Sequence, residues 1–203
     1  MENLFQNLIK RPLAEKMRPT SLESLVGQEH LLGHDAPLGR MLRERRASSM
    51  ILWGPPGSGK TTLARMMAEH VTMRFESLSA VFSGVSDLRK VFDQAVERKK
   101  VGTDTLLFVD EIHRFNRAQQ DSFLPFVEDG TVVLVGATTE NPSFELNSAL
   151  LSRCQVFILE KIDKANLEIL LKRAEELEGK ELPLQQKARD NLLVMADGDG
   201  RFL

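Results

Sequence analysis

Polar and apolar residues follow one another in blocks that predict alternating strands and helices over most of the chain, and helices alone near its end. Five short segments, most of them continuous apolar runs, are expected to form buried strands at 50–53, 74–78, 105–109, 131–137 and 155–159. Apolar residues at helical spacing predict helices between them, at 61–70, at 86–99 with Ser86 as N-cap, and at 117–128 despite Pro125.

This alternation predicts an α/β fold with a five-stranded parallel sheet, right-handed crossovers and flanking helices. Residues 1–20 contain Pro12 and Pro19 and are expected to form an extended arm, followed by short helices within 21–32 and 37–46. Later helices are expected at 163–177 and 185–196, with a third starting at 201–203. We therefore expect three parts, an arm over 1–20, a sheet core over 21–161 and a helical segment over 162–203.

The composition narrows the class of protein only slightly. A net charge of −2, with 28% charged and 42% hydrophobic residues, neither requires nor excludes nucleic acid as a partner. The single Cys154 cannot form an internal disulfide and suits a reducing compartment, and the four histidines show no metal-ligand spacing with it. The sequence shows neither an apolar run of about 20 residues nor a secretory leader, so we expect a cytoplasmic protein with no membrane segment and no zinc.

The most informative short motif is the glycine-rich sequence Gly54-Pro55-Pro56-Gly57-Ser58-Gly59-Lys60-Thr61. It lies between a predicted strand and a predicted helix, and it satisfies the pattern G-x-x-x-x-G-K-[ST] of phosphate-binding loops. Glycines let backbone N–H groups surround phosphate oxygens, and the N-terminus of the following helix adds partial positive charge. We expect these eight residues and Thr62 to bind ATP, with Lys60 reaching the β- and γ-phosphates and Thr61 holding Mg²⁺.

Polar residues also end two neighbouring strands. Asp110 and Glu111 follow the strand at 105–109, which places two carboxylates at the carboxyl edge of the sheet, beside the phosphate loop. We expect Asp110 to hold the Mg²⁺ shell and Glu111 to polarise the water that attacks the γ-phosphate. Thr138 and Thr139 would bind the γ-phosphate or this water, or they would only cap a loop. Arg153 is either a surface arginine or acts in trans, since its own site lies far along the chain.

Further stretches extend over essentially the whole chain: Pro12-Leu13-Ala14, Met17-Arg18-Pro19, Val26 to Leu31, Phe108 to Asn116, Gln119-Gln120-Asp121 and Gly136 to Asn147. Two of them, Asp110 to Asn116 and Gly136 to Asn147, are far more specific than the phosphate loop. Together with the phosphate loop they resemble the AAA+ ATPases of the clamp-loader clade, whose arginine-finger motif is similar to Ser152-Arg153-Cys154. The chain is most closely similar to the family of replication-associated recombination protein A and the eukaryotic Werner-helicase-interacting protein.

The resemblance implies roles for further residues. The adenine pocket would be lined by Leu13, Ala14, Val26 and Gly27. Thr139 would be the sensor-1 residue, and Arg153 the finger that reaches a neighbouring subunit's γ-phosphate. Arg201 would be the sensor-2 arginine of a helical lid, and Ser79 the polar residue that holds the catalytic glutamate inactive until DNA binds. The implied catalytic set is Glu111, Lys60, Thr139, Arg153 and Arg201.

The function implied is that of a DNA-dependent ATPase of replication-fork maintenance, recombination and repair, using ATP and Mg²⁺ in a homo-oligomer that is a tetramer in the intact protein. Implied partners are forked, gapped or junction DNA, contacted through its backbone, and single-strand-binding protein with other replication proteins. Two alternatives stay open, an ATP-dependent scaffold that recruits such proteins and a clamp-loader subunit. Family members are longer, so we expect an N-terminal fragment with an incomplete lid, nucleoid-associated if bacterial.

Overall fold

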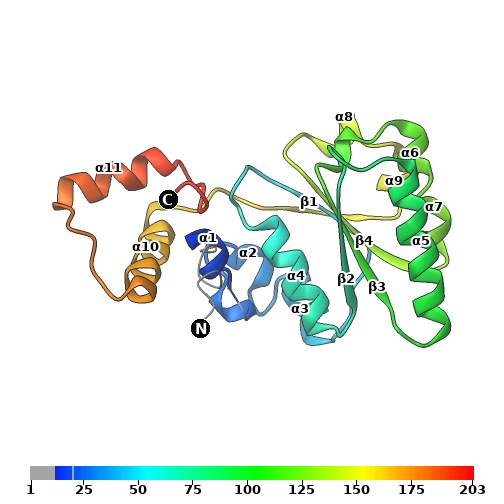
Figure 1. Cartoon of the computed structure of the whole chain (residues 1–203), viewed down its shortest axis with the longest axis horizontal. Coiled ribbons are helices and arrows are strands. Elements are labelled where there is room, and N and C mark those ends of the chain that lie inside the picture. The colour runs from blue at the N-terminus through cyan, green and yellow to red at the C-terminus, as the bar shows by residue number, and fades with distance from the viewer. Residues whose placement is uncertain (1–11, 20) are drawn as a thin grey trace, which may run out of the picture.

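A computed structural model describes residues 12–19 and 21–203 and shows a five-stranded sheet with helices on both faces (Figure 1). Neighbouring strands all run parallel, in the order β2-β3-β4-β1-β5. The strands are β1 (Met50–Trp53), β2 (Arg74–Ser79), β3 (Thr105–Asp110), β4 (Val132–Thr138) and β5 (Gln155–Ile158). The predicted α/β class, the five strands and their parallel arrangement are therefore confirmed.

Helices cover both faces of this sheet. One face packs against α2 (Glu29–Leu32), α3 (Pro37–Arg43) and α4 (Lys60–His70), and the other against α5 (Val85–Lys100), α7 (Leu124–Glu128) and α9 (Ser148–Leu151). Shorter elements are α1 (Leu13–Lys16), η1 (Leu22–Ser24), η2 (Ile112–Arg114), α6 (Arg117–Asp121) and α8 (Pro142–Glu145). The last two helices, α10 (Lys164–Glu178) and α11 (Gln186–Ala196), lie beyond the sheet at the left of Figure 1.

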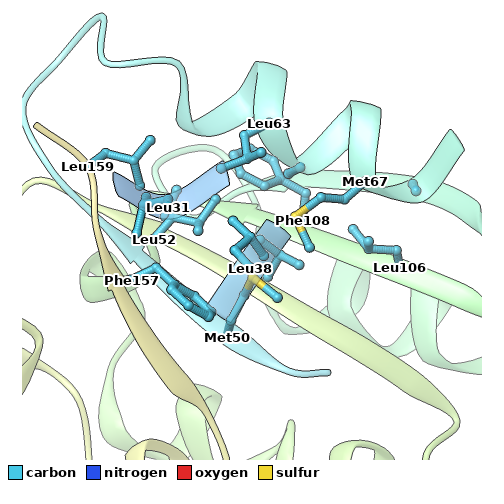
Figure 2. Close-up of a cluster of buried hydrophobic side chains, with 14 of the residues drawn as sticks. Leu31, Leu38, Met50, Leu52, Leu63, Met67, Leu106, Phe108, Phe157 and Leu159 are labelled. Carbon is cyan, nitrogen blue, oxygen red and sulfur yellow. The ribbon is translucent and has the colours of Figure 1, made fainter. Parts of the chain in front are cut away.

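The central strands are mainly apolar because they are buried on both faces. Within β3, Leu106 and Phe108 belong to the cluster under α2, α3 and α4, whereas Leu107 and Val109 belong to the cluster under α5 and α7. Figure 2 shows the first cluster, in which Leu38 of α3 gathers with Phe108 and its neighbours. Burial of each such side chain stabilises the fold by about 1.5–3 kcal/mol, so the two clusters fix the position of the strand ends that carry the polar residues.

The helix predicted over 117–128 is in fact two helices, α6 and α7. Pro125 has no N–H, and in a continuous helix its ring would clash with the carbonyl of residue 121, where α6 ends. Phe123, between the two helices, is fully buried and packs edge-on against Phe92 of α5. The break between the two helices therefore lies at an aromatic side chain that is part of the core.

Three smaller expectations also need correction. The arm is not extended throughout, since residues 13–16 form one helical turn, α1; residues 1–11 and 20 lie outside the described part. Ser86 is not the N-cap of α5, because the helix begins at Val85 and the Asp87 carboxylate accepts a hydrogen bond of 2.8 Å from the N–H of Gly84. Finally, α8 and α9 were not predicted; each is a single turn capped by an asparagine side chain.

The C-terminal helical segment has a small core of its own, built on Leu167, Leu171 and Leu193. Arg189 connects α11 to α10: it donates two parallel hydrogen bonds to Glu175, of 2.8 and 2.9 Å, and a third of 2.8 Å to Glu168. These hydrogen bonds lower the pKa of Glu175 to about 2. Within residues 12–19 and 21–203, no helix has the length and apolar character that crossing a membrane requires.

We predict that E175Q weakens the pairing of α10 and α11, because the bidentate contact with Arg189 is lost. Hydrogen exchange in both helices should accelerate at pH 7, whereas E176Q, at an exposed neighbouring position, should leave it unchanged. The folded-state pKa of Glu175 lies below that of the unfolded chain, so this stabilisation is present above about pH 4.3 and is lost as the pH falls toward 2. The difference between wild type and E175Q should vanish over that range.

Candidate nucleotide-binding site

The phosphate loop leaves the sheet at the carboxyl end of β1 and ends at the N-terminus of α4. The N–H of Gly54 donates a 3.1 Å hydrogen bond to the carbonyl of Thr138, which holds the start of the loop against β4. Gly59, with φ +98°, is the N-cap of α4, a conformation that favours glycine. The free N–H groups of an eleven-residue helix therefore face the hollow of the loop, as a phosphate-binding site requires.

The Lys60 side chain lies inside the phosphate loop and contacts its backbone. Its ammonium donates 2.8 Å hydrogen bonds to the carbonyls of Gly54 and Pro55, and only 8% of the residue is exposed. Burial lowers the pKa of Lys60, an effect that the nearby carboxylates of Glu111 and Asp110 oppose. The ammonium is thus held by neutral carbonyls, which the more strongly accepting oxygens of a triphosphate can replace.

The acidic pair lies where the sequence predicts it, at the end of β3. Asp110 is the last residue of the strand, and Glu111 follows in the left-handed conformation, with φ 52° and ψ 46°. Such a backbone costs a non-glycine residue about 1–3 kcal/mol, and strain of this size is typical of functional positions. It turns the Glu111 carboxylate to within 3.3 Å of His113 Nδ1 and 3.5 Å of Thr139 Oγ1.

The sequence left two roles open for Thr138 and Thr139, contact with the γ-phosphate or water and capping of a loop, and in the structure the two threonines differ. Thr138 is fully buried and caps the turn, because its Oγ1 accepts a 3.0 Å hydrogen bond from the N–H of Glu140. Thr139 instead directs its hydroxyl toward Glu111. Of the pair, Thr139 is therefore the one that faces the acidic residues.

A cavity of about 250 Å³ adjoins the phosphate loop and has the place expected of an adenine pocket. Its lining includes Ala14 and Val26 together with Gly57, Ser58 and Thr62. Two of the residues expected there do not line it: Leu13 lines an adjoining cavity that shares Ala14 with the first, and Gly27 lies beside Asn166 and Ile162. The N-terminal segment thus contributes to the pocket, with Ala14 and Val26 as the two residues of the implied set that line it.

The C-terminal segment reaches the same loop. Arg201 Nη2 lies 3.4 Å from the Thr61 hydroxyl, so the two residues expected to contact phosphate and Mg²⁺ are brought together from positions 140 residues apart. Gly57 faces this segment, and a Cβ atom there would lie 2.7 Å from Cα of Asp199. The loop requires glycine at this position for its φ of +68° and for this close approach alike.

Arg153 lies at the opposite edge of the sheet. It precedes β5, whose first residue pairs with Met50 at the amino end of β1, whereas the phosphate loop follows the carboxyl end of β1. Its guanidinium forms an ion pair with Glu128 and donates a 2.7 Å hydrogen bond to the carbonyl of Ala149. The fold therefore holds Arg153 away from the phosphate loop of its own chain.

Two positions change in importance once the fold is known. Gln28 is 2% exposed, and its side chain donates to the carbonyls of Ser58 and Glu160, which ties the N-terminal segment to the loop. The only signal for it was its place in the family-specific stretch Val26 to Leu31. Ser79 pairs in register with Asp110, but within the described chain the side-chain partners of Glu111 are His113 and Thr139.

Comparison with known families agrees with this geometry. The family described as "ATPase family associated with various cellular activities (AAA)" matches residues 50–161, which contain the phosphate loop, the acidic pair and all five strands. This chain belongs to the AAA family.

Individual curated relatives are similar to this chain over nearly its whole length. It is 54% identical to replication-associated recombination protein A of Coxiella burnetii and 46% identical to that of Escherichia coli, over 94% and 98% of this chain. It is also 50% identical to ATPase WRNIP1 of Dictyostelium discoideum over 94% of this chain. The chain spans 44%, 45% and 22% of the lengths of these relatives, respectively. The resemblance found in the sequence is confirmed.

A solved AAA structure agrees in fold. The Thermotoga maritima RuvB Holliday junction branch migration motor is similar with a TM-score of 0.71 and 28% identity, over 92% of this chain and 62% of that one. A match over 92% of this chain leaves out too few residues to omit either the sheet or most of the C-terminal segment.

Filling the cavity tests whether it holds the base of the nucleotide. A14W should weaken ATP binding by about tenfold or more, roughly 1.4 kcal/mol, because the indole would occupy the space beside Val26 and Gly59. L13W, one residue away on the same helical turn, should leave the affinity nearly unchanged, since Leu13 lines the other cavity. Isothermal titration with a non-hydrolysable ATP analogue measures both; equal losses would show that the base does not bind here.

Proposed function

We propose that this chain is the ATPase part of a DNA-dependent enzyme of replication-fork maintenance, recombination and repair. The observation that carries the proposal is the convergence of Lys60, Asp110, Glu111 and Thr139 at the carboxyl edge of one parallel sheet. Phosphoryl transfer requires such an arrangement, because its catalysis is mainly positioning and charge stabilisation. The proposed parts are the arm over 1–20, the core over 21–161 and a lid that begins at 162.

The proposed reaction is hydrolysis of ATP to ADP and phosphate. Lys60 and the N–H groups of the loop hold the β- and γ-phosphates, and Glu111 orients the attacking water and accepts its proton. Thr139, within reach of Glu111, positions the same water or the γ-phosphate. Arg201, beside Thr61, completes the charge around the phosphates from the C-terminal segment.

The donor set also fits Mg²⁺, which prefers oxygen ligands, keeps several waters and takes few protein ligands beside the phosphates of its substrate. The Thr61 hydroxyl and the Asp110 carboxylate are the two side chains that would hold it. Bound there, the ion would neutralise charge that develops on the phosphate oxygens.

Arg153 belongs to this proposal as a residue that acts on a neighbouring subunit. Its place at the edge opposite the phosphate loop prevents action in cis, and exposed Val156 and Ile158 on the adjoining edge strand offer an apolar surface for a second copy. Together with the resemblance to the relatives, this position and this surface support a homo-oligomer, which we propose to be a tetramer in the intact protein. An arginine supplied in trans contributes about 10³–10⁵ to such a rate.

Nucleic acid and protein partners are proposed from the relatives named for recombination and branch migration. The exposed arginines Arg40, Arg43, Arg45 and Arg46 suit contacts with DNA phosphates, which carry no sequence information. We propose forked, gapped or junction DNA as the ligand, single-strand-binding protein among the partners, and the cytoplasm as the compartment. A recruiting scaffold is the second candidate, and exposed Phe82 and Phe144 favour it, because such side chains are common in protein interfaces.

Replacing Glu111 distinguishes turnover from recruitment. E111Q should retain ATP binding but lose ATP hydrolysis by at least about 10²-fold, because the amide cannot accept the proton of water. ATP turnover by the full-length wild type is measured without DNA and with forked, gapped and blunt duplexes, with E145Q as the exposed control. Equal wild-type rates under all four conditions would contradict DNA dependence, and fork tolerance that survives E111Q in cells would favour the scaffold.

Mixing two inactive variants tests action in trans. R153A should lower turnover by about 10³-fold, since the finger is removed, while R117A, another exposed arginine, should not. Adding E111Q subunits to R153A subunits should restore part of the activity, because each R153A site then receives Arg153 from its E111Q neighbour. Failure of the mixture to exceed the sum of the separate rates, with mixed oligomers present, would contradict the role.

A further inference from the structure

His113 lies between the acidic pair and the end of β4. Its Nδ1 is 3.3 Å from Oε2 of Glu111 and 2.9 Å from Oγ1 of Thr138. The side chain of His113 is 8% exposed and Thr138 is fully buried, so these contacts are shielded from water. One ring nitrogen thus lies between the general base of the proposed reaction and the last residue of β4, which Thr139 follows.

The partners of Nδ1 decide whether this nitrogen carries the hydrogen of the imidazole ring. The Glu111 carboxylate can only accept, so an unprotonated Nδ1 would direct its lone pair at a negative oxygen. Thr138 has a single hydrogen, which its 3.3 Å contact with the carbonyl of Glu140 can use. We therefore assign the hydrogen to Nδ1, which donates it to Oγ1 of Thr138 and lies 3.3 Å from the Glu111 carboxylate.

The backbone explains how the imidazole reaches this place. The 3-10 turn η2 follows Glu111 directly, and the N–H of Arg114 closes it by a 2.8 Å hydrogen bond to the Glu111 carbonyl. Ile112, fully buried in the cluster under α5, anchors the turn to the core. His113 is thereby turned back toward the residue two positions before it.

Glu111 needs such support because its side chain is long and only partly enclosed. It is 31% exposed, and an unrestrained glutamate would sample several rotamers, at a cost in free energy each time the attacking geometry is formed. A general base that is displaced by about 1 Å can lose on the order of 10²-fold in rate. The contact with Thr139 is longer, at 3.5 Å, so His113 is the closer of the two recorded partners.

We propose that His113 is a positioning residue for ATP hydrolysis, which holds the Glu111 carboxylate in place and couples it through Thr138 to the end of β4. Because Thr139 follows Thr138 directly, a shift of this strand end on binding the γ-phosphate is passed to Glu111 through the imidazole. The inference rests on the proposed function, since it concerns the rate of the same reaction. It assigns to His113 no contact with the nucleotide.

Four variants separate this role from a structural one. The side-chain amide of asparagine places its N–H close to where Nδ1 lies, whereas that of glutamine places it closer to Nε2. H113L should lower kcat for ATP by about 10–10²-fold with KM nearly unchanged, because the imidazole contact with Glu111 is lost but nucleotide contacts remain. H113N should recover most of the rate, and H113Q should not. T138V, which removes the link to β4, should lower kcat in the same direction.

A double variant completes the test in the full-length protein. In an E111Q background, H113L should cause no further loss of residual turnover, because a positioning residue acts only through the group that it positions. An unchanged kcat in H113L, equal defects in H113N and H113Q, or multiplicative losses with E111Q would each overturn the inference while leaving the ATPase intact. A loss of melting temperature or ATP affinity in place of kcat would also overturn it. Absence of turnover in the wild type would overturn the proposed function itself.

Discussion

The parallel register of β3, β4 and β1 is the constraint on which the rest of the site depends. Trp53 pairs with Thr138, and the N–H of the next residue, Gly54, bonds to the Thr138 carbonyl. Val109 pairs with Gly136 on the other side of β4, so the phosphate loop, the acidic pair and the threonines emerge at one edge. Strands lie about 4.8 Å apart, which brings groups from three distant segments within reach of one triphosphate.

This edge is costly to build, and the core on both sides of the sheet stabilises it. Lys60 is buried against carbonyls, and Glu111 holds a left-handed backbone that its residue type disfavours. Both are adjacent to fully buried apolar residues, Leu63 on α4 and Ile112 on η2. Tight packing there keeps the polar groups in one arrangement, which a site that works by positioning requires.

Two segments outside the sheet complete the site. Gln28 ties the N-terminal segment to the loop, and Arg201 reaches Thr61 from the C-terminal segment. The C-terminal segment is held by a small core of its own and by the charged contacts of Arg189. Its local stability is therefore lower than that of the strands. A nucleotide bound between these segments would therefore contact parts of different local stability.

Local pattern by itself determined the class of fold, the strands, the phosphate loop and the acidic pair, because each depends on residues that are close in sequence. It failed at the break between α6 and α7, where Phe123 and Pro125 divide a predicted helix, and at the cavity beside the phosphate loop, which Ala14 lines but Leu13 does not. Thr138 and Thr139 were equivalent as sequence. Only the tertiary structure separates them, because His113 contacts the hydroxyl of Thr138, whereas Glu111 contacts the hydroxyl of Thr139. These contacts join residues that are 25 and 28 positions apart.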